Sequence, residues 1–224
     1  MLLWNLNLLF DKPGVFFTAI PLAIIALLPM LVFHEVSHGF VANWLGDDTA
    51  KNLGRLSLNP FSHLDRAGTV MLLLVGFGWA KPVPVNPYRL GMEPRKGMAI
   101  VGAAGPATNF ILAAIFALIY RAASIELPNS WEDLAFSDVV GVLIFFIVQI
   151  NLILGVLNLI PVPPLDGFRV AVGVLPKEYA VSFAKLEKYS LQILVIFFMV
   201  LMFTGFLWVI VRSVVNSFLG QDIY

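Results

Sequence analysis

Two histidines and a glutamate near the start of the chain have the spacing of a metal-binding helix. They form the pattern H-E-x-x-H in His34-Glu35-Val36-Ser37-His38. On a helix the two histidines lie one turn apart on one face, so both imidazoles can bind a single Zn²⁺. Glu35 between them is then placed to act as a general base. The alternative is a polar, solvated helix end, but two of the three histidines in the chain fall in this pattern, which favours a metal site.

A catalytic zinc site needs a third protein ligand and an open position. The chain has no cysteine, so the ligand must be His, Asp, Glu or Asn. Asp166 is the best candidate, because it follows an apolar run and a three-proline stretch. Irregular backbone at membrane depth is tolerated only where it is buried in protein or lines a cavity. Two alternatives stay open: Asp166 caps a short helix, or His63 is the ligand.

The elements that must position these residues are membrane helices. Residues of the hydrophobic class make up 59% of the chain and charged residues 12%, against about a quarter charged in soluble domains. We therefore expect an integral, all-α polytopic membrane protein. The four expected spans are Gly14–Leu45, Gly97–Tyr120, Val139–Leu165 and Tyr189–Val211. The H-E-x-x-H pattern then lies within the hydrocarbon, near one end of the first span.

Shorter segments complete the expected fold. Ala67–Ala80 is too short to span and is followed by Pro82, Pro84 and Pro87, so we expect a small β-hairpin-like re-entrant loop. Gly167–Leu175 is expected to be a short helix. Met1–Phe10 is expected at the membrane interface, with no cleavable signal peptide. We expect a single domain over 1–224, with its core at about 14–204 and no appended soluble domain.

Charge predicts the orientation and excludes one class of partner. With these four spans, eleven of the fourteen basic residues fall on one side. They are Lys51, Arg55, Arg66, Lys81, Arg89, Arg95, Lys96, Arg169, Lys177, Lys185 and Lys188. The basic side of a membrane protein is cytoplasmic, so the metal site is expected to open toward the cytoplasm, with the plasma membrane as the expected location. The net charge is zero and no basic tract suggests nucleic acid.

Taken together, the motifs resemble the site-2 protease family of intramembrane zinc metalloproteases, in its compact bacterial and archaeal form. The resemblance rests on HEVSH in a membrane helix, Ala104-Gly105-Pro106 opening a later helix, and Asn158…Pro161…Leu165-Asp166-Gly167. It implies one Zn²⁺ per chain on His34, His38 and Asp166, with Glu35 as general base. It also implies Asn158 near the metal as an oxyanion donor, although a helix–helix hydrogen bond is the alternative for this residue. Asn109 is interpreted as a packing residue.

The resemblance also implies a substrate and a way to bind it. The substrate would be a transmembrane protein that meets the enzyme within the lipid bilayer. The segment Gly76, Phe77, Gly78, Trp79, Ala80 and Lys81 resembles the re-entrant β segment of the family. We expect it to pair with a locally unwound substrate by strand addition. A purely structural hairpin is the alternative.

Two other functions are compatible with the sequence. Intramembrane His, Asp and Glu also mark ion pathways, so a metal-ion or proton transporter is possible. Transporters are expected to show repeats, and this chain shows none. A catalytically inactive homologue that binds membrane partners is the second, and the intact Glu35 argues against it. The sequence specifies neither the substrate, the cleavage site nor the oligomeric state.

Overall fold

The computed structural model describes residues 10–11, 13–75, 78–128 and 135–220, and within these ranges the chain is helical with no strand. The helices are α2 (Pro13–Trp44), α3 (Thr49–Asn52), α4 (Arg66–Val75), α5 (Pro94–Ala122), α6 (Phe136–Leu159), α7 (Asp166–Val174), α8 (Lys177–Ala184), α9 (Ser190–Thr204) and α10 (Phe206–Leu219). Three 3₁₀ turns, η2 (Pro60–Ser62), η3 (Pro87–Arg89) and η4 (Lys185–Tyr189), join them. The predicted all-α class is confirmed.

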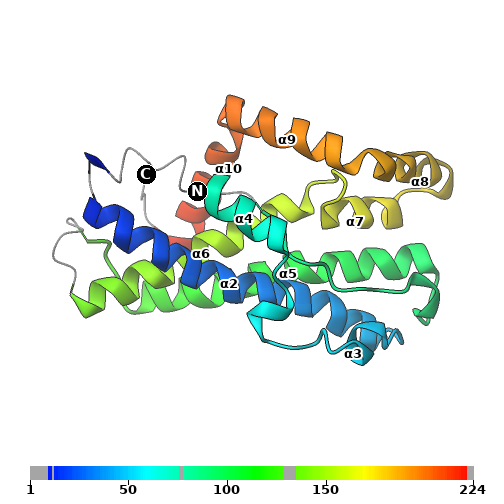
Figure 1. Cartoon of the computed structure of the whole chain (residues 1–224), viewed down its shortest axis with the longest axis horizontal. Coiled ribbons are helices and arrows are strands. Elements are labelled where there is room, and N and C mark those ends of the chain that lie inside the picture. The colour runs from blue at the N-terminus through cyan, green and yellow to red at the C-terminus, as the bar shows by residue number, and fades with distance from the viewer. Residues whose placement is uncertain (1–9, 12, 76–77, 129–134, 221–224) are drawn as a thin grey trace.

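Three helices in the described ranges are long and apolar enough to cross a membrane, namely α2, α5 and α6. They correspond to the first three predicted spans. Helix α5 contacts α2, α6 and α7 (Figure 1). Helix α2 ends at Trp44, and Gly46 takes a positive φ of 109° in the turn that follows, as glycine can at little cost. Helix α2 therefore runs uninterrupted through the H-E-x-x-H pattern.

Helix α6 ends six residues before the predicted end of the third span, at Leu159 rather than Leu165. The cause is Pro161, which disfavours helical backbone at the residue before it. The chain then turns into α7, whose second residue is Gly167. A Cβ atom on Gly167 would lie 2.2 Å from the Leu159 carbonyl oxygen, so only glycine permits this contact between α7 and the end of α6. This contact sets the start of α7, and with it Asp166, against the bundle.

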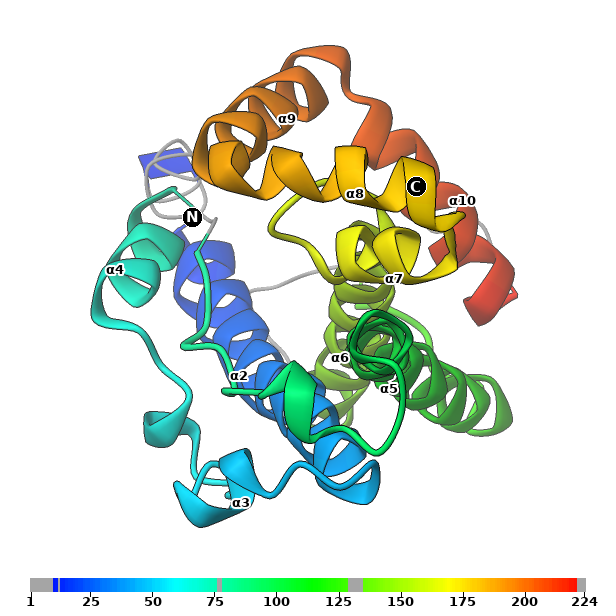
Figure 2. The same ribbon diagram turned by 90° about the vertical axis from the view of Figure 1, so that its right-hand side faces the viewer.

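The fourth predicted span, 189–211, is divided between two helices. Helices α9 and α10 contain 15 and 14 residues and are separated by Gly205, which has a positive φ of 65°. The fourth span accordingly stays a prediction. Helices α7, α8 and α9 lie together on one side of the α2, α5 and α6 bundle (Figures 1 and 2).

The chain between α2 and α5 enters and leaves α4 at nearly the same place. Leu64, before α4, forms an isolated antiparallel bridge with Ala80, after it. Gly68 and Gly78 also meet closely, since a Cβ on Gly78 would lie 2.1 Å from the Gly68 carbonyl oxygen. The re-entrant loop stays a prediction. The described part of the loop has one β-bridge and no hairpin with paired strands. The prediction that Met1–Phe10 lies at the membrane interface concerns residues outside the described ranges, except for Phe10.

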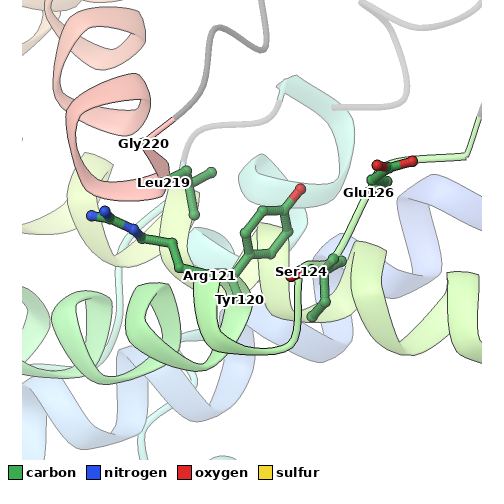
Figure 3. A pocket seen from close by; sticks show the side chains of 7 residues that line it. Tyr120, Arg121, Ser124, Glu126, Leu219 and Gly220 are labelled. Atoms are coloured by element: carbon green, nitrogen blue, oxygen red, sulfur yellow. The ribbon is translucent and has the colours of Figure 1, made fainter.

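Helix α10 packs against the far end of α5. Val211, Val215 and Leu219 join a buried cluster with residues of α5 and α6. Beside it lies a cavity of about 300 Å³, lined by Tyr120, Arg121, Ser124, Ile125, Glu126, Leu219 and Gly220 (Figure 3). Its lining shares no residue with the H-E-x-x-H pattern.

Candidate metal centre

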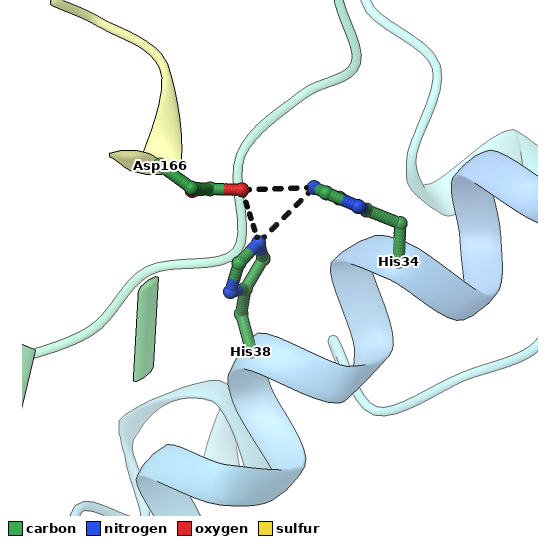
Figure 4. A group of neighbouring side chains, drawn as sticks. All are labelled: His34, His38 and Asp166. Carbon is green, nitrogen blue, oxygen red and sulfur yellow. Dashed lines mark hydrogen bonds and ion pairs between the residues drawn. The ribbon is translucent and has the colours of Figure 1, made fainter. Parts of the chain in front are cut away.

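His34, His38 and Asp166 converge at one point although they come from α2 and α7 (Figure 4). The Nε2 atoms of His34 and His38 lie 3.0 and 3.1 Å from Oδ2 of Asp166, and 3.2 Å from each other. All three residues are buried, with exposed fractions of 5%, 6% and 8%. Three ligand atoms facing one another in a buried site are the arrangement that a bound cation requires.

The donor set and its dimensions fit zinc. Two imidazole nitrogens and one carboxylate oxygen are a known ligand set of catalytic zinc sites. Two ligands each ~2.0–2.1 Å from zinc at a tetrahedral angle are about 3.3 Å apart. The three edges of the cluster measure 3.0, 3.1 and 3.2 Å, so small adjustments would accommodate the ion. Three protein ligands leave the fourth position for water or substrate.

The orientation of His34 is set by a buried relay of amides. Its Nδ1 lies 2.6 Å from Oδ1 of Asn109, and Nδ2 of Asn109 donates to Oδ1 of Asn151 at 2.8 Å. Asn151 in turn donates to the Ile147 carbonyl oxygen at 2.8 Å. When Nε2 of a histidine binds metal, Nδ1 carries the proton, so Asn109 accepts from His34 and fixes its tautomer. The relay extends from α2 through α5 to α6.

The Nδ1 side of the His38 ring is held by helix α5. Its Nδ1 lies 2.7 Å from the Val101 carbonyl oxygen, which accepts the proton when Nε2 binds metal. One turn further along α5, Gly105 faces both rings. A Cβ on Gly105 would lie 2.5 Å from both Cε1 of His34 and Nε2 of His38. The absence of a side chain at Gly105 therefore provides the space in which the two imidazoles meet.

Glu35 is held from a different direction. Its Oε2 accepts a hydrogen bond of 3.2 Å from the backbone N–H of Val83. Val83 belongs to the extended chain between the Leu64–Ala80 bridge and η3. The proposed base is thus half-buried, on the helix that carries both histidines, and attached to the segment that follows the re-entrant loop.

Two other residues considered as site residues make their recorded hydrogen bonds outside the cluster. Nδ2 of Asn158 donates to the Leu154 carbonyl oxygen within its own helix, at 3.0 Å. His63 is buried, but its Nε2 bonds to the Ser57 carbonyl oxygen at 2.7 Å, and it is not part of the three-residue group. Leu165 holds the N-cap position of α7, whereas the Asp166 carboxylate faces the histidines.

The predicted substrate segment is only partly described. Gly76 and Phe77 lie outside the described residues. Gly78 packs on Gly68, and Ala80 is bridged to Leu64. Lys81 donates its backbone N–H to the His63 carbonyl oxygen at 2.7 Å. One edge of this segment is therefore occupied by the chain before α4. The Trp79 side chain is 46% exposed.

Sequence reasoning missed the residues that hold the histidines. Asn109 was interpreted as packing and Asn151 was not singled out. A signal for both exists, because asparagine inside a long apolar helix is expected to find a polar partner on a neighbouring helix. The sequence does not say which neighbour that is.

Comparison with known proteins places the chain in a family. A model described as Peptidase family M50 matches residues 121–201. The protein named "Putative zinc metalloprotease YwhC" from Bacillus subtilis is 36% identical over 202 residues, which covers 89% of this chain and 90% of that protein. No solved structure matches the chain.

More distant relatives agree with this match. "Putative zinc metalloprotease Rip2" from Mycolicibacterium smegmatis is 27% identical over 178 residues, 78% of this chain and 65% of that protein. "Zinc metalloprotease MJ0392" from Methanocaldococcus jannaschii is 25% identical over 155 residues, 69% of this chain and 34% of that protein. The match to YwhC spans nearly the whole of both chains and agrees with the motif resemblance. The chain belongs to peptidase family M50, the site-2 protease family.

Proposed function

We propose that this protein is a zinc endopeptidase that cleaves transmembrane proteins within the bilayer. The observation that carries the proposal is the convergence of His34, His38 and Asp166, whose ligand atoms all lie within 4.8 Å of one another. Two of these residues lie on a 32-residue apolar helix, α2, that is long enough to cross a membrane. Relatives named zinc metalloproteases support the same reaction class.

The proposed chemistry divides between the ion and the chain. A zinc ion held by His34, His38 and Asp166 would polarise the scissile carbonyl and make water more acidic. Glu35 takes the proton from the attacking water as it adds to the carbonyl carbon, and then passes it to the leaving amine. Asn158 is proposed to donate its amide N–H to the developing oxyanion, which requires its present bond to the Leu154 carbonyl oxygen to be exchanged.

The substrate must present an extended peptide, because a helix hides its amides in i→i−4 hydrogen bonds. We propose that the segment 76–81 pairs with it by strand addition. Since Lys81 donates to the His63 carbonyl oxygen, Leu64 and Ala80 form a non-hydrogen-bonded antiparallel pair. In such a pair the N–H and C=O of each residue point away from the partner strand. Ala80 is therefore the residue proposed to pair with substrate.

We also propose that the site opens toward the cytoplasm, in the plasma membrane. Support comes from the basic residues around the metal-proximal ends of α2 and α5. The chain between α2 and α5 and the first turn of α5 carry Lys51, Arg89, Arg95 and Lys96. The positive-inside rule makes such a basic region cytoplasmic. Cysteine substitution at Lys51, followed by labelling from either side of sealed vesicles, tests this orientation.

The test of the proposed function is cleavage in a reconstituted bilayer. The purified protein and a single-span substrate are placed in liposomes, and zinc content and products are measured for the wild type and for Glu35→Gln. We expect one zinc per chain in both, and a loss of cleavage of at least about 100-fold in the variant, because the proton acceptor is gone. Wild-type protein that moves metal ions across the liposome and cuts nothing would overturn the proposal in favour of transport.

A further inference from the structure

The extended segment 80–86 is fastened to the rest of the protein at both of its ends. At the first end, Arg55 donates from Nη2 to the Lys81 carbonyl oxygen at 2.7 Å. At the other end, the Asn86 N–H donates to Oδ2 of Asp47 at 2.6 Å. Asp47 is fully buried, three residues after the end of α2. A backbone fixed at two points holds its central residues in a defined place.

The centre of this segment carries a single backbone donor. Pro82 and Pro84 have no N–H, so Val83 provides the only backbone donor of the tripeptide. That donor is directed at Oε2 of Glu35, at 3.2 Å. Among the described residues, this is the one hydrogen bond made by the Glu35 carboxylate.

Helix α2 has a notch that lets the segment approach. Gly39 lies one turn after Glu35, and a Cβ there would lie 2.9 Å from Cγ1 of Val83 and 2.6 Å from Cδ2 of Leu56. The Val83 side chain is buried, with an exposed fraction of 8%. The notch, the flanking prolines and the Arg55 contact are separate features, and all three concern the stretch of backbone that carries the Val83 N–H.

We infer that the segment 80–86 is a positioning element for Glu35, with the Val83 N–H as its contact and Arg55 as the side chain that holds it in register. The inference rests on the proposed role of Glu35 as general base. A hydrogen bond to one carboxylate oxygen fixes the rotation of the carboxylate and leaves the other oxygen to accept the proton. The same segment begins at Ala80, the proposed substrate-pairing residue, so pairing and base placement share one rigid piece of backbone.

The first test needs no substrate. Backbone hydrogen exchange at Val83 is measured in detergent micelles for the wild type, Glu35→Gln and Glu35→Ala. Glutamine retains an acceptor oxygen, so the Val83 amide should stay protected; alanine removes it, and exchange should become about tenfold faster or more. Equal exchange in the wild type and the Glu35→Ala variant would overturn the inference, whether or not the protein cleaves anything.

The second test separates positioning from packing. Val83→Pro removes the N–H, and Val83→Ala removes only side-chain contacts. We expect kcat of Val83→Pro to fall on the order of 10- to 100-fold below that of Val83→Ala, with KM and zinc content similar in the two variants.

The outcomes are distinguishable. An equal kcat in Val83→Pro and Val83→Ala, with wild-type cleavage intact, contradicts the positioning role and leaves the protease proposal standing. If the wild type cleaves nothing, the protease proposal is contradicted. The exchange measurement then still tests whether the Val83 N–H is bonded to Glu35. If Val83→Pro fails to fold, the Glu35→Ala exchange result decides the inference.

Discussion

Two of the three proposed metal ligands and the proposed general base lie on one helix, α2, yet the protein holds them in different ways. His34 and His38 are fixed by neighbouring membrane helices, through Asn109 and the Val101 carbonyl oxygen. Glu35 is instead held by one backbone N–H of an extended segment outside those helices. If the proposed roles hold, metal binding and proton transfer depend on separate parts of the structure. Changes in the helix bundle should alter zinc affinity, and changes in the segment 80–86 should alter turnover with zinc retained.

The largest effect is expected from the ligand that joins the two helices of the site. Asp166→Ala removes the single carboxylate facing both histidines, so bound zinc should fall from one per chain to near zero and cleavage should be lost. Metal analysis of the purified protein measures this. Asp48→Ala is the matched control, because Asp48 is an exposed carboxylate paired with Arg89. Full zinc occupancy in Asp166→Ala would contradict the assignment of Asp166 as a zinc ligand.

Gly105→Ala should disturb the helix packing that holds the two histidines and leave the segment 80–86 unchanged. Replacing a helical glycine with alanine ordinarily stabilises a protein by up to about 1 kcal/mol. At Gly105 the added Cβ would overlap both imidazoles, so we expect a net destabilisation of about 1–3 kcal/mol. Zinc affinity should fall by at least about tenfold, since both ligands must move. A rise in thermal stability with unchanged zinc affinity would show that the rings do not meet at Gly105.

The asparagine relay should affect zinc affinity more weakly. Asn109→Leu keeps the approximate volume and leaves the Nδ1–H of His34 without its acceptor. We expect zinc binding to weaken about 10- to 100-fold, and less for Asn151→Leu, which is one hydrogen bond further away. Asn158→Leu is the control, because its recorded bond lies within its own helix: zinc affinity should hold while cleavage falls. Competition with a chelator measures all three.

The smallest effect should come from the substrate-pairing edge. Ala80→Pro removes the N–H that is directed away from Leu64, whereas Ala80→Ser keeps it. We expect cleavage to fall about tenfold in the proline variant relative to the serine variant, with zinc content equal. Peptide products from liposomes provide the measurement. Equal cleavage in the two variants would favour a purely structural role for this loop.

The sequence predicts the metal ligands better than it predicts what holds them. The spacing of His34 and His38 implies a shared helix face, and an aspartate after a proline-rich break is a strong candidate for a third ligand. The partners of Asn109 and Asn151 depend on how three helices rotate against one another, and no local pattern specifies that rotation. The Glu35–Val83 hydrogen bond joins residues 48 positions apart, so periodicity and turn chemistry carry no information about it.

Helix ends are likewise predicted only where a local residue pattern specifies them. Pro94 begins α5 as a first-turn proline should, and α6 ends two residues before Pro161. The predicted span 189–211 continues through Gly205 because the stretch contains no charged residue. A glycine in the left-handed conformation separates two helices there, and hydropathy does not register a backbone conformation.

The most direct measurement is the X-ray absorption spectrum of the zinc-loaded protein. The account predicts two imidazole nitrogens and one carboxylate oxygen at about 2.0–2.1 Å, with the fourth position taken by a light, non-imidazole atom. Asp166→Ala should remove this signature, and His63→Ala should leave it unchanged. A wild-type spectrum with three imidazoles, lost on substitution of His63, would contradict the assignment of Asp166 and the convergence of α2 and α7 on one ion.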